Sequence, residues 1–264
     1  MTVPAPDEPL IAPLVAALRA AGCVFAEDEA ALLVREAADE DALAAMVARR
    51  VAGEPLEQVV GFADFLGLRV AVAPGVFVPR LRTTLLARRA AGSLEPGDVA
   101  VDLCCGTGAV GMAMLAAVPG LEVHAADIDP AAVACARRNL PPDRVHEGDL
   151  YDALPAALRG RLAVVAANAP YVPTGAIATM PPEARDHEHP VALDGGADGL
   201  DVARRVLAGA PQWLAPGGRV LVETSAAQRD VAAAYADAAG LDVTTASADD
   251  VDGTVVIGRL RPRR

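Results

Sequence analysis

The chain has 264 residues, enough for one large domain or for a medium domain with a small one attached. Hydrophobic residues make up 53% of the chain, which excludes a disordered protein, and the formal net charge of −12 disfavours nucleic acid, whose phosphates repel an acidic surface. No apolar run reaches the ~18 residues of a membrane helix, so we expect no membrane partner.

Two further features point to a cytoplasmic protein. The start of the chain lacks the charged residues and continuous apolar core of a secretory signal. The four cysteines, Cys23, Cys104, Cys105 and Cys135, show no CxxC spacing, so we expect reduced thiols and neither a disulfide framework nor a zinc site.

Residues 1–60 are predicted to form a small helical domain. Leu10, Leu14 and Leu18 recur at intervals of four, and Leu43, Met46 and Val47 repeat the helical spacing.

After this domain, the spacing of the apolar residues changes to that of a strand. In residues 67–80, apolar residues alternate up to Pro74-Gly75 and again after it, which predicts a β-hairpin that turns there, within a linker over residues 61–82.

From residue 83 to residue 264, strands and helices alternate, which predicts an α/β domain. The sequence predicts strands at Val99–Leu103, Leu121–Ala126, Arg144–Glu147, Leu162–Ala167, Arg219–Glu223, Leu241–Thr245 and Thr254–Gly258. It predicts helices at Ala109–Ala117, Pro130–Arg138, Leu200–Leu214 and Ala226–Ala239. This order indicates a doubly wound, Rossmann-like sheet that is mostly parallel, with helices on both faces and an antiparallel last strand.

A glycine-rich loop follows the first of these strands. After Asp102 the chain reads Cys104-Cys105-Gly106-Thr107-Gly108 and then enters a helix. Glycines at alternate positions let the backbone approach a ligand, and the helix N-terminus offers free N–H groups. A plain strand-to-helix turn would explain the same pattern.

Acidic residues end the next two strands. Asp127 lies 21 residues after Gly106, where a carboxylate can accept both hydroxyls of a ribose, so the two features together indicate a nucleoside cofactor. Gly111 would complete a GxGxxG pattern, which leaves a dinucleotide open, although it lies inside the predicted helix. Asp149 could accept from the amine of adenine, with Leu150 over the ring, or could be a solvated loop residue.

The fourth predicted strand ends in Asn168-Ala169-Pro170-Tyr171. Proline fixes φ without needing a donor, and tyrosine offers an apolar face with a polar tip. Further along, residues 186–189 read Asp-His-Glu-His, but four adjacent polar residues in a proline-flanked loop are typical of a solvated segment, so we expect no metal. Cys104 and Cys105 are interpreted as small packing residues rather than as a redox pair.

Taken in order, the glycine loop, the acidic ribose residue and the tetrapeptide resemble class I S-adenosylmethionine-dependent methyltransferases. More narrowly, the chain resembles the release-factor (protein-glutamine N5) methyltransferases. Residues 54–80 are similar to that family's interdomain hairpin, and residues 188–224, "EHPVALDGGADGLDVARRVLAGAPQWLAPGGRVLVET", are similar to its C-terminal signature.

The resemblance implies a role for each site residue. It makes Asp102, residues 104–108, Asp127, Asp149, Leu150 and Asn168 binding residues for S-adenosylmethionine. It makes residues 168–171 the catalytic tetrapeptide, in which the Asn168 side-chain oxygen and the Ala169 carbonyl accept the two N–H groups of a substrate amide. It places residues 186–196 near the substrate and gives the helical domain a role in substrate recognition. The implied partner is a protein, a peptide release factor, and a monomer is favoured.

Three departures from the family pattern bear on the substrate. Ala169 replaces a proline of the usual Asn-Pro-Pro-Tyr, Cys104 and Cys105 replace Gly and Thr, and residues 81–84 lack the usual proline and acidic residues. Two alternatives to the glutamine reaction therefore stay open. One is an amino-directed methyltransferase acting on a small molecule or a nucleic acid, and the other is a cofactor-binding module without catalysis.

Overall fold

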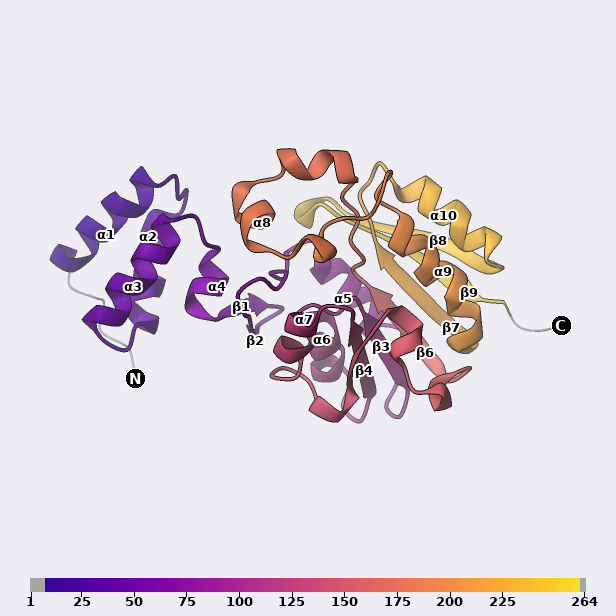
Figure 1. Cartoon of the computed structure of the whole chain (residues 1–264). Coiled ribbons are helices and arrows are strands. Elements are labelled where there is room, and N and C mark those ends of the chain that lie inside the picture. Colours follow the sequence, from indigo (N-terminus) through magenta and orange to yellow (C-terminus); the bar gives the residue numbers. More distant parts are fainter. Residues whose placement is uncertain (1–7, 262–264) are drawn as a thin grey trace.

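The computed structural model describes residues 8–261, and it places a group of helices beside a larger α/β body (Figure 1). The predicted absence of a secretory signal concerns the very start of the chain, and residues 1–7 lie outside the described part. Among the helices of residues 8–261, none combines the length and the apolarity needed to cross a membrane.

The first group consists only of helices, as the apolar spacing predicts. They are α1 (Glu8–Ala20), α2 (Ala26–Glu36), α3 (Glu40–Val51) and α4 (Leu56–Val60). Leu18, Ala30, Leu33 and Val59 are buried where they meet. Burial of a leucine or valine side chain contributes roughly 1.5–3 kcal/mol, which gives these short helices a core of their own.

A β-hairpin follows, but the predicted position of its turn is wrong. Strands β1 (Phe62–Phe65) and β2 (Leu68–Ala71) pair antiparallel, and the chain turns at Leu66-Gly67 rather than at Pro74-Gly75. Both turn residues have positive φ, 52° and 77°, and this pair of left-handed residues matches the twist of a two-residue hairpin. Gly75 instead forms a parallel bridge with Glu188, so its segment binds the loop before α9.

The α/β body contains a seven-stranded sheet. Its strands are β3 (Val99–Leu103), β4 (Glu122–Asp127), β5 (Val145–Glu147), β6 (Leu162–Ala167), β7 (Leu214–Glu223), β8 (Leu241–Ala248) and β9 (Gly253–Leu260), in the order β5-β4-β3-β6-β7-β9-β8. All neighbouring pairs are parallel except those of β9, which runs antiparallel to both β7 and β8. The predicted mostly parallel sheet with an antiparallel last strand is confirmed.

Helices cover both faces of this sheet, as expected for a doubly wound fold. The helices of the α/β body are α5 (Thr83–Ala91), α6 (Ala109–Ala117), α7 (Pro130–Ala136), α8 (Pro182–His187), α9 (Asp201–Trp213) and α10 (Arg229–Ala238), and all but α8 lie on a face of the sheet. Short 3₁₀ turns lie at Pro142–Arg144, Leu150–Ala153, Ala156–Leu158, Thr174–Thr179, Pro190–Ala192 and Asp249–Val251. On one face Val101 and Val165 pack with Leu207 of α9, and on the other Val164 and Leu221 pack with Met114 of α6. Because the strands are buried on both faces, their ends are where polar side chains can gather.

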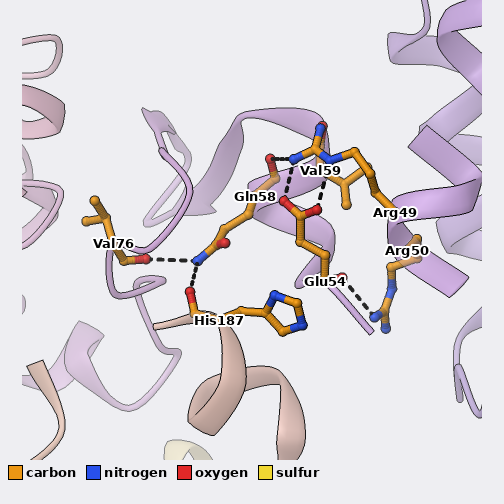
Figure 2. Close-up of polar contacts among 7 residues, drawn as sticks. All are labelled: Arg49, Arg50, Glu54, Gln58, Val59, Val76 and His187. Carbon is orange, nitrogen blue, oxygen red and sulfur yellow. Dashed lines mark hydrogen bonds and ion pairs between the residues drawn. The ribbon is translucent and has the colours of Figure 1, made fainter. Parts of the chain in front are cut away.

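The helical group is attached through contacts near α8. The Gln58 side chain donates to the carbonyls of Val76 (3.1 Å) and His187 (3.2 Å), which joins α4 to the end of α8 (Figure 2). Arg50 of α3 pairs with Glu183 of α8, with 2.7 Å between Nη1 and Oε1. These contacts place α8 between the helical group and the edge of the sheet.

Candidate functional site

The predicted site residues gather around one cavity at the C-terminal edge of the parallel strands. Its volume is about 500 Å³, within the range of small-molecule sites. Of the predicted site residues, those that line it are Asp102, Cys104, Cys105, Gly106, Thr107, Asp127, Asp149, Leu150, Asn168, Ala169, Pro170 and Tyr171. Loops after β3, β4, β5 and β6 therefore converge, as the topology requires.

Gly108 is the predicted residue that does not line the cavity. It has a φ of +78°, and a Cβ built on it would lie 2.8 Å from Leu140 Cδ1. Gly111 is similarly close to Leu140 and Val123, at 3.2 and 3.3 Å. Both glycines therefore let α6 pack closely against its neighbours, and Gly111 has the packing role that its position inside the helix suggests.

The loop itself is shaped by left-handed backbone at Cys104 and Gly106, each with a φ of +53°. At Gly106 the absence of a side chain fits this conformation, whereas Cys104 bears a cost of roughly 1–2 kcal/mol. Burial raises the pKa of the Cys104 and Cys105 thiols well above their ordinary value. Since neutral thiols are poor nucleophiles and all four cysteines are free, the pair lines the cavity as small neutral side chains.

Asp127 is held at the end of β4 by two backbone donors. Its Oδ2 accepts from the Gly106 N–H and its Oδ1 from the Asp129 N–H, at 2.8 and 2.9 Å. Burial raises the pKa of its carboxyl, against the effect of these bonds. Because each carboxylate oxygen has further lone-pair capacity, Asp127 can still accept from a ligand hydroxyl in the cavity.

Asp102 is the most buried acidic group of the cavity. Its Oδ2 accepts from the Gly111 N–H at 2.8 Å, and burial raises the pKa of its carboxyl to about 8. A buried carboxyl with one hydrogen bond favours a cationic partner, because a positive charge nearby would compensate the loss of water.

Asp149 pairs with Arg205 of α9, with 2.7 Å between Oδ2 and Nη2. This ion pair was not predicted, because Arg205 lies in a helix more than fifty residues further along the chain. Leu150 is buried with a φ of +49°, which turns the chain at the cavity wall. Asp149 is therefore a paired residue of the cavity rather than a free loop carboxylate.

The tetrapeptide is fixed from two sides. Asn168 Nδ2 donates to Thr83 Oγ1 at 3.3 Å. The carboxamide oxygen, Asn168 Oδ1, takes no part in this hydrogen bond. The carbonyl of Tyr171 accepts from the Gln228 side chain at 2.9 Å. Burial raises the pKa of the Tyr171 phenol, which therefore stays neutral. These contacts make residues 168–171 a rigid wall of the cavity.

The glycines of the C-terminal signature pack directly against this wall. A Cβ on Gly195 would lie 2.6 Å from the Pro170 carbonyl oxygen, and one on Gly199 would lie 2.2 Å from that of Tyr171. Real Cβ atoms do not approach so closely, so only glycine fits at either position. Val191, Ala192 and Leu193 line the same cavity, so part of the 186–196 segment, which we expect near the substrate, lies at the site.

The interpretation of residues 186–189 as solvated is wrong for Glu188. This side chain is buried, pairs with Arg80 at 2.6 Å and accepts from the Val78 N–H at 3.0 Å. Within residues 8–261, no group of three or more His, Cys, Asp or Glu side chains is placed to hold a metal.

Sequence reasoning missed the part of the cavity that residues 76–83 and α8 supply. Phe77, Arg80 and Thr83 line the cavity from one side, and Met180 and Ala184 line it from another. The similarity of residues 54–80 to an interdomain segment was the one signal for the first group, whereas no local pattern marked the second.

Comparison with known proteins places the chain in a family. The family description "Methyltransferase small domain" matches residues 68–180. A release factor glutamine methyltransferase of Streptomyces coelicolor is 41% identical over 67% of this chain and 65% of its own length. The corresponding protein of Geobacter sulfurreducens is 32% identical over 81% of this chain and 76% of its own.

Two other comparisons bear on function and on fold. A 4-amino-L-phenylalanine/4-methylamino-L-phenylalanine methyltransferase of Streptomyces pristinaespiralis is 39% identical over 67% of this chain and 63% of its own. A methyltransferase structure from Pyrococcus furiosus superposes with a TM-score of 0.57 and 18% identity, over 81% of this chain and 97% of that one, which shows the shared fold. Because the Geobacter sulfurreducens protein is more than 30% identical and is matched over 76% of its length, the chain belongs to the release factor glutamine methyltransferase family.

Proposed function

We propose that this protein transfers a methyl group from S-adenosylmethionine to the side-chain amide nitrogen of a protein glutamine in a peptide release factor. The observation that carries the proposal is that Asn168 and Asp127 line one cavity. There, the tetrapeptide that contains Asn168 can hold an acceptor amide, and the Asp127 carboxylate can bind a ribose. Two relatives that match 67% and 81% of this chain are named for that reaction.

The residues present fit S-adenosylmethionine. Gly106 and the left-handed backbone around it leave room for a close approach, and Asp127 retains acceptor capacity for two ribose hydroxyls. Asp102 offers a buried carboxyl to a positive group, and S-adenosylmethionine carries an ammonium and a sulfonium. When bound, the cofactor supplies an electrophilic methyl group on its sulfur.

The chain's own residues would position the acceptor. An amide nitrogen is a poor nucleophile because its lone pair is delocalised into the carbonyl. Asn168 Oδ1 and the Ala169 carbonyl can accept the two N–H groups of a glutamine amide, which aims the remaining lone pair at the cavity. Pro170 fixes the backbone of this wall, and Tyr171 offers a flat face to a planar amide. Catalysis would then rest on positioning and electrostatics, with the proton leaving after transfer.

Ala169 keeps the backbone carbonyl that this arrangement needs. The residue is buried, and its neighbours are fixed by Thr83 and Gln228, so the loss of one proline ring is compensated by contacts from other elements. We therefore expect an active enzyme rather than a binding module without catalysis.

The helical group would recognise the protein substrate, with residues 1–60 as the recognition domain and residues 83–264 as the methyltransferase domain. The ties from Gln58 and Arg50 to α8 support this role, because Glu183 and Ala184 of α8 line the cavity. A protein bound to α1–α4 would thus lie beside the acceptor end of the site.

A small-molecule amine is the second candidate acceptor. The relative from Streptomyces pristinaespiralis is named for methylation of an aromatic amine, and it is nearly as similar to this chain as those named for glutamine. An arylamine nitrogen carries two N–H groups that Asn168 and Ala169 could accept in the same way.

The test is mass spectrometry of purified release factors incubated with the protein and S-adenosylmethionine, beside 4-aminophenylalanine as a competing acceptor. One added methyl on the glutamine of the release factor's glycine-glycine-glutamine tip supports the proposal. Methylation of the arylamine alone supports the second candidate. Cofactor binding in calorimetry with no transfer to either acceptor would indicate a module without catalysis.

A further inference from the structure

One buried acidic group next to the cavity is used by none of the chemistry above. Glu223, the last residue of β7, is 1% exposed. Neither of its carboxylate oxygens has a hydrogen-bond partner among residues 8–261. An unsatisfied buried polar group costs about 1–3 kcal/mol, and more when charged, so its presence at this position calls for a reason.

The sheet register places Glu223 beside Asn168. Strands β6 and β7 are parallel neighbours, and Ala167 pairs with Val222. Asn168 and Glu223 each follow one of these paired residues, so their side chains project to the same face at the same edge of the sheet. The two polar groups are thus brought together by the backbone and not by flexible loops.

Thr83, at the start of α5, lies between them. Its hydroxyl oxygen accepts from Asn168 Nδ2, and its side chain is buried. Burial raises the pKa of Glu223 to about 7, and the Thr83 hydroxyl and the Arg82 guanidinium oppose that rise, although neither makes a hydrogen bond of normal geometry with the carboxylate. Tyr171 is the other titratable group that faces Glu223, and it stays neutral. From β9, the neighbour on the other side is Val255.

We propose that Glu223 is a positioning residue, which sets the orientation of the Asn168 carboxamide through the Thr83 hydroxyl. The inference rests on the proposed function, because it assigns Asn168 the task of accepting a substrate N–H. Thr83 has one proton and two acceptor sites. When an ionised Glu223 accepts a hydrogen bond from the Thr83 hydroxyl, Thr83 can only accept from Asn168 Nδ2, so Asn168 Oδ1 is presented to the substrate.

Loss of the charge removes this constraint. With a neutral Glu223, the Thr83 proton is free to donate to Asn168 Oδ1, and the carboxamide can flip. The flipped group presents two donors to a substrate amide whose own N–H groups need acceptors. Turnover therefore depends on ionised Glu223, and it should rise with pH up to a plateau above about pH 7.

The kinetic test compares Glu223→Gln, Thr83→Val and Thr83→Ser with the unmodified protein, across pH 5.5–9, on an unmethylated release factor as substrate. A wrongly oriented acceptor loses a hydrogen bond of the strength found with charged or strongly polar partners, so kcat should fall about 10- to 100-fold in Glu223→Gln and Thr83→Val. The rise of kcat towards neutral pH should vanish in both variants. Thr83→Ser keeps the hydroxyl and should restore both the rate and the pH profile.

Cofactor binding serves as the control, because a variant that binds the cofactor normally is also folded. The dissociation constant for S-adenosylmethionine should stay within about twofold in every variant, because Glu223 and Thr83 lie on the acceptor side of the site. A Glu223→Gln protein that binds the cofactor normally but keeps the rate and pH profile of the unmodified enzyme would overturn the inference.

An NMR measurement that does not require methyl transfer separates this inference from the proposed function. In ¹⁵N-labelled protein, the side-chain amide signals of Asn168, assigned with Asn168→Ala, should shift with a midpoint near pH 7 and should not shift in Glu223→Gln. If no release factor is methylated, the proposed function fails while this shift still tests the positioning role. If the signals do not respond to Glu223, the positioning role fails whatever the substrate.

Discussion

The side-chain amide of Gln228 donates to the backbone carbonyls of Tyr171 and Asp198, both at 2.9 Å. Its side-chain oxygen meanwhile accepts from Ser225, at 2.7 Å from the hydroxyl. One glutamine thus joins the tetrapeptide, the glycine loop before α9 and the end of β7. Because these three segments meet at a fully satisfied group, a small displacement of any one should disturb the acceptor end of the site.

Gly199 offers a test of the junction at Gln228, by which we mean the meeting of these three segments at its side chain. A Cβ there would lie 2.2 Å from the Tyr171 oxygen and 2.4 Å from Gln228 Nε2. We expect Gly199→Ala to displace the tetrapeptide and to lower kcat roughly 100-fold, because misplacement by about 1 Å has effects of that size. Gly160→Ala is the matched control, since Gly160 also has a positive φ, +71°, but no atom within 4 Å of its Cβ position. Equal losses in the two variants, measured by methyl transfer and by calorimetry of cofactor binding, would indicate that backbone strain and not the contact is responsible.

Asn168 is the residue whose replacement should most clearly separate binding from transfer. Asn168→Ala removes the acceptor oxygen, and Asn168→Asp keeps an oxygen but adds a negative charge that favours the bound sulfonium over a transition state whose positive charge is dispersing. Transition-state positioning of this kind is worth about 3–4 kcal/mol, so kcat should fall roughly 100-fold or more in either variant. Cofactor affinity should change little in Asn168→Ala and rise in Asn168→Asp. Near-normal turnover in either variant would reduce the tetrapeptide to a strand-ending turn.

Asp127→Ala should weaken cofactor binding. A hydrogen bond to a charged group contributes about 1.5–3 kcal/mol, so loss of the ribose acceptor predicts a dissociation constant for S-adenosylmethionine about tenfold higher or more. Asp143→Ala, at an exposed position, should leave the constant unchanged. Calorimetry measures both, and an unaltered affinity in Asp127→Ala would remove Asp127 from the cofactor site.

We expect the buried carboxyl of Asp102 to make the stability of the cofactor-free protein depend on pH. Its folded-state pKa of about 8 lies above the ordinary value of 3.8, so folding favours the protonated form. The stability that this group contributes is complete below pH 3.8 and is lost as pH rises towards 8. Asp102→Asn keeps the acceptor for Gly111 and removes this loss. Even one pKa unit corresponds to about 1.4 kcal/mol, or a few degrees in Tm, so the variant should melt at least that much higher than the unmodified protein at pH 8 but not at pH 4. Asp143→Asn should show no such divergence in calorimetric scans.

Gln58 tests whether the helical group serves the protein substrate. Gln58→Leu keeps the approximate volume and leaves the carbonyls of Val76 and His187 without their donor, at a cost of about 1–3 kcal/mol. We expect KM for a release factor to rise several-fold as α8 loosens, while cofactor affinity is retained. Gln212→Leu, on an exposed position of α9, is the control. Unchanged KM in Gln58→Leu would argue against a coupled recognition role.

The sheet was predictable from sequence because buried parallel strands are apolar runs between polar ends. The bounds of β3, β6 and α6 agree residue for residue with those predicted, and β7 begins five residues earlier, at Leu214. The hairpin turn was misplaced because Pro74-Gly75 is a stronger local turn signal than Leu66-Gly67, where leucine occupies a left-handed conformation. Helix α5 was not predicted, and it begins after Arg82 without a side-chain cap.

The residues of the site were predictable from sequence only where they lie together in a short segment of the chain. The loop at 102–108, Asp127 and residues 168–171 follow their strands directly, so the topology alone brings them together. The hydrogen bonds of Thr83 with Asn168 and of Gln228 with Tyr171 join residues 85 and 57 positions apart, and no periodicity records such pairings. Long-range polar contacts of this kind depend on the register of the sheet, which a single sequence does not give.

The junction at Gln228 also sets an order of events during synthesis. All the predicted cofactor residues except Asn168 precede residue 151, whereas the carbonyl of Tyr171 is held by the Gln228 side chain, which follows Tyr171 by 57 residues. At a translation rate of ~5–20 residues per second, roughly 3–11 s separate the synthesis of these two residues. The segments that carry the predicted cofactor residues are therefore synthesised seconds before the side chain that fixes the tetrapeptide. A chain that ends before β7 lacks Gln228, so its tetrapeptide would be without this contact.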